Sequence, residues 1–229
     1  MTSPPPSGKV VQLRELLRER FPEAHARRAE PDGADEPLGI AVLDRLAIAE
    51  RGSITEVVSE TPGRGAGLLL YEVIRDSAAQ SRPLALIDGR DTFDPQSQPP
   101  GACESLLWIR CHAAKDAVRA ADLLLRDGNL SLLLIDLEQN PSRELRRIPS
   151  SSWHRLRMLT EKAGCVCLAF TPMRLIPSAG TRVHFTSAYA LDALDTPREI
   201  LAGNLQFHIS GKAAKDTPLK EQLKEPLAK

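Results

Sequence analysis

The chain has 229 residues, of which 42% are hydrophobic, enough to bury the core of a single domain. Its 30 basic and 30 acidic residues give a formal net charge of zero. This balance excludes the global positive field of proteins that bind nucleic acid without specificity, although it leaves room for local basic patches.

Residues 1–37 predict a helix and a linker outside the main domain. The run KVVQLRELLRERF places apolar residues at helical spacing, namely Val10, Leu13, Leu17 and Phe21. The polar stretch that follows contains several prolines and no periodicity, which favours a linker. We therefore expect this helix to lie apart from the core or to dock on a partner, with self-association as one form of docking.

Residues 38–210 predict an α/β domain, because short apolar runs alternate with amphipathic segments. The expected strands are residues 53–58, 84–88, 105–110, 131–137 and 165–170, and the expected helices are residues 68–79, 113–128 and 152–164. Repetition of strand, helix and strand indicates a mostly parallel central sheet flanked by helices. Two later runs, 182–194 and 204–210, alternate apolar with polar residues and predict antiparallel edge strands.

The final residues, 211–229, predict a disordered tail or a segment that folds on a partner, because they contain two prolines and few large apolar groups. Leu219, Leu223 and Leu227 recur every fourth residue. They would form one apolar helical edge if Pro226 did not oppose the last turn.

No pattern predicts a metal centre or a hydrolase. The cysteines include no Cys-x-x-Cys pair, and Cys165 and Cys167 share one face of an apolar run, which favours buried reduced thiols. The five histidines lack ligand spacing. Because the sequence shows neither a signal pattern nor an apolar run of about 18 residues, we expect a cytoplasmic protein without membrane contact.

The run EVVSETPGRGAGLLL leads from a predicted strand through a glycine-rich turn into a predicted helix, which is the layout of a phosphate-binding loop. In a loop of the form Gly-x4-Gly-Lys-Thr, backbone amides cradle phosphates, the lysine meets the terminal phosphates and the hydroxyl holds Mg²⁺. Here Ser59 stands at the first glycine and, after Gly63, Arg64 stands at the second. Gly65 replaces the lysine and Ala66 the threonine, so the loop is degenerate.

Four segments, in order, resemble the core of RecA-type ATPases. LGIAVLDRLAIAERGSITEVVSE resembles its opening, and LALIDGRDTFDP resembles its next strand with an Asp-Pro signature at Asp94 and Pro95. SLLLIDL resembles its second acidic strand, which carries Asp136, and GTRVHFTSAYALDAL is similar to the strand after its second DNA-binding loop. The resemblance spans about residues 38–194 and implies a RecA-like fold.

The resemblance also implies positions for catalytic groups, and these positions hold other residues. Arg90 stands where the family has a catalytic glutamate, two residues after Asp88, and Pro172 replaces a glutamine that senses nucleotide. Asp136 remains, either as a magnesium ligand or as a strand-end carboxylate that caps amides. We expect no catalytic residue, no metal and no cofactor; the alternative is a divergent ATPase that uses Arg64 and Asp136.

Residues 138–157 occupy the place of the family's first DNA loop. They gather Arg143, Arg146, Arg147, Arg155 and Arg157 around Trp153. Arginines beside an aromatic ring suit phosphates and stacked bases, so the segment is a candidate for weak single-stranded DNA binding; a solvated helix start beside a partly buried Trp is the alternative. The second loop is cut down to LIPSAG, which argues against filament formation on DNA.

Taken together, the lost phosphate lysine, the separate N-terminal helix and the shortened loop resemble the ImuA group, RecA-related accessory proteins of bacterial damage-induced mutagenesis. The resemblance implies a non-catalytic adaptor in translesion synthesis. Its implied partners are a Y-family-like ImuB protein and an error-prone replicative-type polymerase, with RecA as a further candidate. The related alternative is SulA, a cell-division inhibitor that binds FtsZ and is usually shorter at its N-terminus.

Overall fold

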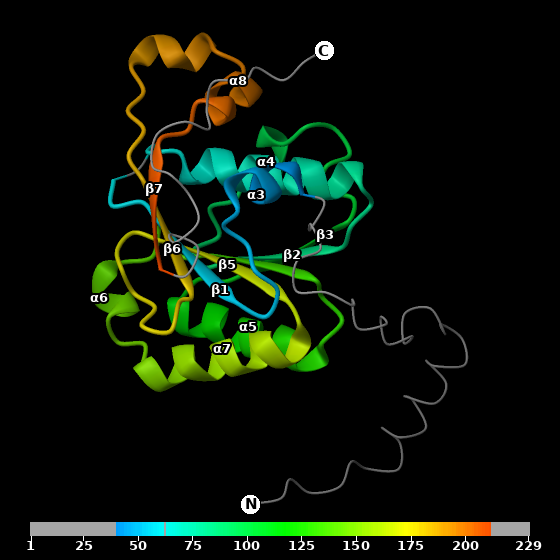
Figure 1. Cartoon of the computed structure of the whole chain (residues 1–229), viewed down its shortest axis with the longest axis vertical. Helices are drawn as coiled ribbons and strands as arrows, with labels where there is room; N and C mark the ends of the chain where they lie inside the picture. The colour runs from blue at the N-terminus through cyan, green and yellow to red at the C-terminus, as the bar shows by residue number, and fades with distance from the viewer. Residues whose placement is uncertain (1–39, 62, 212–229) are drawn as a thin grey trace, which may run out of the picture. The chain divides into compact units, whose positions relative to one another are not determined.

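The computed structural model describes residues 40–61 and 63–211, which form a seven-stranded sheet with helices on both faces (Figure 1). The strands are β1 (Ile54–Val58), β2 (Leu84–Asp88), β3 (Leu106–Arg110), β4 (Leu132–Asp136), β5 (Val166–Thr171), β6 (Thr181–Phe185) and β7 (Phe207–Gly211). The α-helices are α3 (Ala41–Leu46), α4 (Ala66–Ala79), α5 (Ala114–Asp127), α6 (Ser142–Leu145), α7 (Ser150–Ala163) and α8 (Arg198–Gly203). The predicted α/β fold with a mostly parallel sheet is confirmed.

The sheet has the order β3-β2-β4-β5-β1-β6-β7, and neighbouring strands are parallel from β3 through β6. The last pair is antiparallel, with Val183 of β6 opposite Ile209 of β7. The predicted antiparallel pair at the end of the sheet is thus confirmed, although β6 itself runs parallel to β1. The expected strand over 182–194 is wrong beyond Phe185, because residues 191–195 form a 3₁₀ helix, η2.

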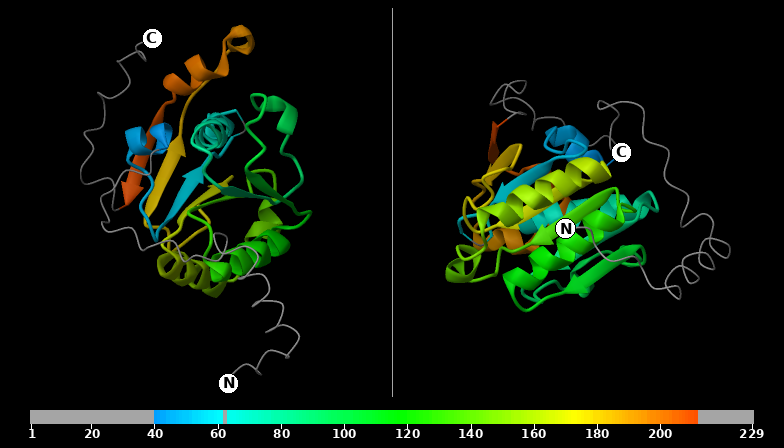
Figure 2. Two further views of the ribbon diagram at one scale, coloured as in Figure 1. Left: turned by 90° about the vertical axis from the view of Figure 1, so that its right-hand side faces the viewer. Right: turned by 90° about the horizontal axis from the view of Figure 1, so that it is seen from below.

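Two apolar cores lie on opposite faces of the sheet, because successive residues of a strand point to opposite sides. On one face, α3 and α4 pack over a core that includes Val57, Leu69 and Leu86. On the other face, α5 and α7 lie side by side (Figure 2) over a core that includes Ile87 and Trp153. Parallel strands covered on both faces explain why the apolar runs in the sequence are nearly continuous.

Glycines end α5 and α7, which form the lower layer, on the opposite side of the sheet from the upper layer of α3 and α4. Gly128 follows α5 with φ of 73°, and Gly164 follows α7 with φ of 60°. The amide of Gly128 donates to the carbonyl of Leu124 at 3.3 Å, which satisfies a carbonyl of the last turn. A side chain at these positions would be strained by the left-handed backbone.

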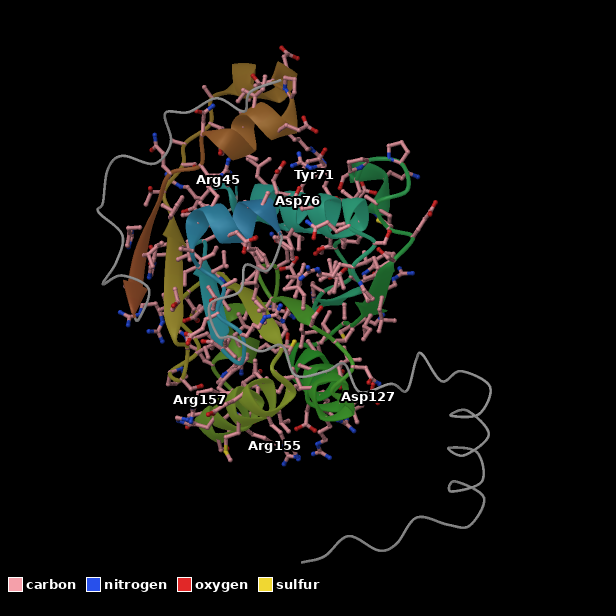
Figure 3. The ribbon with its side chains drawn as sticks, turned by 45° about the vertical axis from the view of Figure 1, so that its right-hand side comes forward. Arg45, Tyr71, Asp76, Asp127, Arg155 and Arg157 are labelled. Carbon is pink, nitrogen blue, oxygen red and sulfur yellow. The ribbon has the colours of Figure 1, made fainter. Side chains whose placement is uncertain are left out.

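Three short helices have no counterpart among the predicted elements: α3, α6 and α8. Helix α8 packs on α4 through a polar contact, because the Tyr71 hydroxyl donates to Glu199 at 2.7 Å. The guanidinium of Arg198 lies 5.4 Å from the centre of the Tyr71 ring. Tyr71 and Asp76 belong to this upper layer, whereas Arg155 and Arg157 belong to the lower one (Figure 3).

Within the described parts of the chain, no helix is long and apolar enough to cross a membrane. The cysteines are free thiols, and Cys111, Cys165 and Cys167 are buried.

Candidate functional site

The glycine-rich loop and Asp136 lie at one edge of the sheet. Strands β1, β2, β4 and β5 are parallel neighbours, so their carboxyl ends lie along the same edge, which we call the carboxyl edge. In open α/β sheets ligands bind outside this edge. Ser59, Asp88 and Asp136 stand at or just beyond the ends of three of these strands. The loop and these side chains therefore occupy the place where a nucleotide site would lie.

The glycine-rich loop closes onto the core instead of presenting an open cradle. Gly65 precedes the first residue of α4 and has φ of 114°, a conformation that favours glycine. A Cβ built on Gly65 would collide with the side chain of Leu205 and would lie 3.2 Å from Phe185. The space into which a lysine side chain would leave from this position is therefore filled by apolar groups.

Arg64 contacts backbone carbonyls, whereas the ATPase alternative requires it to contact a phosphate. Its Nη1 donates to the carbonyl of Ser187 at 3.3 Å and approaches that of Thr186 at 3.4 Å. Both carbonyls follow strand β6. The guanidinium is thus engaged with the backbone beyond β6.

Asp136 is half-buried and caps a backbone amide. Its Oδ1 accepts the N–H of Glu138 at 3.0 Å, which is the role of a strand-end carboxylate, one of its two predicted alternatives. Burial raises the pKa of Asp136 to about 6; the hydrogen bond from Glu138 opposes this shift, and the charge of Asp88 adds to it. The surroundings of Asp136 thus favour its neutral form more than those of an exposed aspartate do.

Glu138, which the sequence reasoning missed, forms an acidic pair with Asp136. The pKa of Glu138 is raised to about 7, mainly by burial and also by the charge of Asp136, while a hydrogen bond with Ser59 opposes the rise. Ser59 itself is buried, and its amide donates to Thr171 at 3.0 Å. Two acidic residues spaced by one position at the end of an apolar strand were the signal that could have revealed this pair.

Asp88 organises the turn after β2. Its carboxylate accepts three backbone amides, those of Arg90 at 3.2 Å, Thr92 at 3.0 Å and Phe93 at 2.8 Å. Arg90 points its Nη1 to the carbonyl of His112 at 2.8 Å. Arg90 thus links the turn after β2 to the loop after β3.

The Asp-Pro signature also has a local structural role. Asp94 accepts the amide of Gln96 at 3.0 Å and precedes Pro95 at the start of a short 3₁₀ helix, η1 (Pro95–Ser97). An aspartate cap followed by proline is a favourable helix start.

The arginine segment divides into an exposed group and a buried centre. Arg143, Arg146 and Arg147 lie on and just after α6 and are exposed. Trp153 is 1% exposed and belongs to the core beneath α7, so in this structure its ring is not accessible for stacking on a DNA base, and the alternative of a buried Trp is favoured. Arg155 is exposed, and its Nε lies 2.5 Å from Asp122 of α5. A tryptophan at the first turn of an amphipathic helix packs inward because its apolar area is large.

Glu56, also missed, organises the shortened loop between β5 and β6. It is fully buried, and its carboxylate accepts the amides of Leu175 at 2.6 Å and Ile176 at 2.9 Å. The Nε of Arg182 lies 2.7 Å from the same carboxylate, and Arg182 also donates to the carbonyl of Ile176. The buried carboxylate of Glu56 thus holds the shortened loop between β5 and β6 against the sheet.

Two hollows occur elsewhere on the described surface. One of about 350 Å³ lies between α5 and α7 and is lined by Val118, Leu123 and Leu156 with Asp122 and Arg155. The other, of about 490 Å³, is formed by the loop from Pro95 to Glu104. Neither is lined by a residue of the glycine-rich loop.

The predicted partner-binding residues lie outside the described parts of the chain. These residues are Val10, Leu13, Leu17 and Phe21 in the N-terminal segment and Leu219, Leu223 and Leu227 in the C-terminal segment.

Among the described residues, no group of three or more His, Cys, Asp or Glu side chains is arranged to hold a metal ion. No protein-family model matches the chain, and no curated protein matches it.

Proposed function

We propose that this protein is a non-catalytic, RecA-like adaptor of a bacterial translesion synthesis complex, of the ImuA type, which binds a Y-family-like ImuB partner. The observation that carries the non-catalytic part is the packing at Gly65. A lysine at that position would meet Leu205 and Phe185, so the packing around Gly65 leaves no room for the side chain that carries the phosphate-binding ammonium. The type of adaptor rests on the sequence resemblance.

The divergent ATPase is the competing proposal, and the contacts of its two supposed catalytic groups weigh against it. Arg64 donates to backbone carbonyls beyond β6, and Asp136 accepts a backbone amide. To act on a nucleotide, both groups would have to give up these contacts. Ala66 still offers no hydroxyl to hold Mg²⁺.

A nucleotide titration separates the two proposals. The full chain is titrated with a fluorescent ATP analogue in the presence of Mg²⁺, and its melting temperature is measured with millimolar Mg-ATP. We expect no saturable binding and no shift in the melting temperature, whereas a ligand at 100 times its dissociation constant would add about 2.7 kcal/mol to the free energy of unfolding. Saturable binding that Arg64→Ala and Asp136→Asn both abolish would establish the ATPase instead.

The adaptor role is tested by co-purification with the candidate partners. Full-length protein and a truncation lacking residues 212–229, which keeps Gly211 at the end of β7, are expressed with an ImuB-like protein, and a third variant carries Leu13→Asp with Leu17→Asp. We expect the truncation to weaken recovery of ImuB. We expect it to keep the thermal midpoint, because β7, the last strand of the sheet in the described residues, ends at Gly211. We expect the double variant to disrupt self-association or docking.

Each result has a defined meaning. Equal recovery of ImuB with the full-length and truncated proteins would place the interaction on the core. No recovery of ImuB with the full-length protein, together with recovery of FtsZ, would replace the adaptor proposal by the cell-division inhibitor.

A further inference from the structure

Two histidines face each other across the antiparallel edge of the sheet. His184 of β6 stands directly opposite His208 of β7 in the register, and their rings are stacked with centroids 4.6 Å apart and planes 2° from parallel. Their neighbours Val183 and Ile209 point to the core on the α3 and α4 side of the sheet, so both imidazoles lie on the opposite face of the sheet. His184 is half-buried and His208 is exposed, which leaves the pair open to solvent on one side.

The surroundings of His184 favour the neutral form of its ring. Partial burial lowers the pKa of His184, and the positive charges of His208 and Arg174 lower it further, whereas Glu60 and Glu56 oppose these effects. Of these carboxylates, Glu56 is already paired with Arg182, and Glu60 is exposed just after β1. A neutral imidazole carries a free nitrogen lone pair, which is the form that binds a metal.

We propose that His184 and His208 form a binding site for a divalent transition metal ion of the Ni²⁺, Cu²⁺ and Zn²⁺ class, which joins β6 to β7. Imidazole nitrogen is a preferred ligand for these ions. Directly opposite residues of an antiparallel pair have Cβ atoms about 4.5–5.5 Å apart, so two side chains can reach one ion. With metal–nitrogen bonds of about 2.0–2.1 Å, the two donor nitrogens must come within roughly 4 Å of each other.

The stacked rings must turn to reach that arrangement, because each nitrogen lone pair lies in the plane of its ring and the two planes are 2° from parallel. Binding therefore requires rotation about the side-chain torsions of both residues, while the ladder keeps the backbone of both strands fixed. The protein supplies two ligands, and water completes the coordination on the exposed side. The site is thus an open one, and it differs from the acidic pair at the carboxyl edge in favouring imidazole-binding ions over Mg²⁺.

The test is a calorimetric titration of the full chain, free of a histidine tag, with NiCl₂ at pH 7.5. The site variants are His208→Asn and His184→Asn. The matched controls are His154→Asn, an exposed histidine on α7, and Cys103→Ser, a partly exposed thiol. We expect one saturable Ni²⁺ site, at least tenfold weaker in both site variants and unchanged in both controls. Repetition at pH 5.5 should weaken it, because protons compete for the imidazoles.

Three results would overturn the proposal: no saturable Ni²⁺ binding by the unmodified chain, wild-type affinity in His208→Asn, or loss of binding in either control. If His184→Asn fails to fold, His208→Asn decides alone, because its side chain is exposed and its replacement should leave the fold intact. A rise in melting temperature with Ni²⁺ that His208→Asn removes would support the proposed link between the strands.

Discussion

Arg182 of β6 and Glu56 of β1 stand in register on neighbouring parallel strands and form a buried ion pair, with 2.7 Å between Nε and the carboxylate. The Glu56 side chain has no exposed surface, and that of Arg182 is 16% exposed. A charge removed from water to this degree requires partners, and Glu56 also accepts two amides of the loop after β5. The pair thus couples two strands and a loop.

Glu56→Ala should therefore be strongly destabilising. It leaves Arg182 and two loop amides without their acceptor, and breaking a buried pair from one side costs about 3–5 kcal/mol. Chemical denaturation of the purified protein measures the loss. Arg157→Ala, which removes an exposed pair with Glu161, is the control and should cost less than about 1 kcal/mol. Equal losses for the two variants would contradict the role assigned to Glu56.

Glu138→Gln should change how stability depends on pH. Because the folded-state pKa of Glu138 is raised to about 7, the folded protein binds a proton more tightly than the unfolded chain. Its contribution to stability is fully present below the usual glutamate pKa and is lost as pH rises through about 7. Between pH 4.5 and 8, the wild type should therefore lose on the order of 2 kcal/mol of unfolding free energy relative to the Glu138→Gln variant.

Denaturation curves at several pH values measure this difference, and the subtraction removes the contribution of other groups. The lowered pKa of His184 acts in the opposite direction, since its contribution grows as pH rises through the usual histidine range. A difference that stays constant from pH 4.5 to 8 would mean that Glu138 titrates in the folded protein as it does in the unfolded chain.

Gly65 and Gly67 should respond oppositely to alanine. At Gly65 the backbone has φ of 114° and a Cβ would strike Leu205, so Gly65→Ala should destabilise by at least about 1 kcal/mol. At Gly67, inside α4, nothing lies within 4 Å of the added carbon, so Gly67→Ala should stabilise by about 0.5–1 kcal/mol. Thermal unfolding of both variants decides. A stabilised Gly65→Ala protein would show that the loop opens readily and would weaken the proposal of a non-catalytic fold.

The arginines around α6 provide the test of DNA contact. Replacing Arg143, Arg146 and Arg147 by glutamate should abolish retention on single-stranded DNA at low salt, because phosphate contacts depend on these charges. Stability should change by less than about 0.5 kcal/mol per substitution, since all three side chains are exposed. Arg119→Glu on α5, an exposed arginine outside this segment, is the control. Unchanged retention in the triple variant would make the arginines a solvated surface without a DNA role.

Strands β1 to β5 were predictable to within about a residue because buried parallel strands leave continuous apolar runs, as in LALID, which is the whole of β2. Helices with a clear apolar stripe and a glycine stop, such as α5, were equally predictable. By contrast, the helix α8 has only six residues, and it is held by long-range contacts such as the one between Tyr71 and Glu199. Sequence patterns carry no record of such contacts.

The candidate site was predictable in position and unpredictable in its contacts. The glycine-rich turn and Asp136 fall at the carboxyl edge as expected from parallel strands. The blocking of Gly65 by Leu205, however, joins residues 140 positions apart, and local sequence cannot report it. Trp153 shows the same limit. A tryptophan among arginines has the composition of a binding surface, yet in the structure this ring is packed in the core.

The division of the apolar interior by the sheet has a consequence for how this chain can change over time. Gly65, Phe185 and Leu205 belong to the packing above the sheet, whereas Trp153, Ile176 and the helices beneath them belong to the packing below it. Substitutions that share no neighbours have nearly additive effects on stability. The upper layer can therefore accumulate replacements around the glycine-rich loop while the lower layer keeps its own surface under separate selection, so the two faces of one small domain can follow different evolutionary histories.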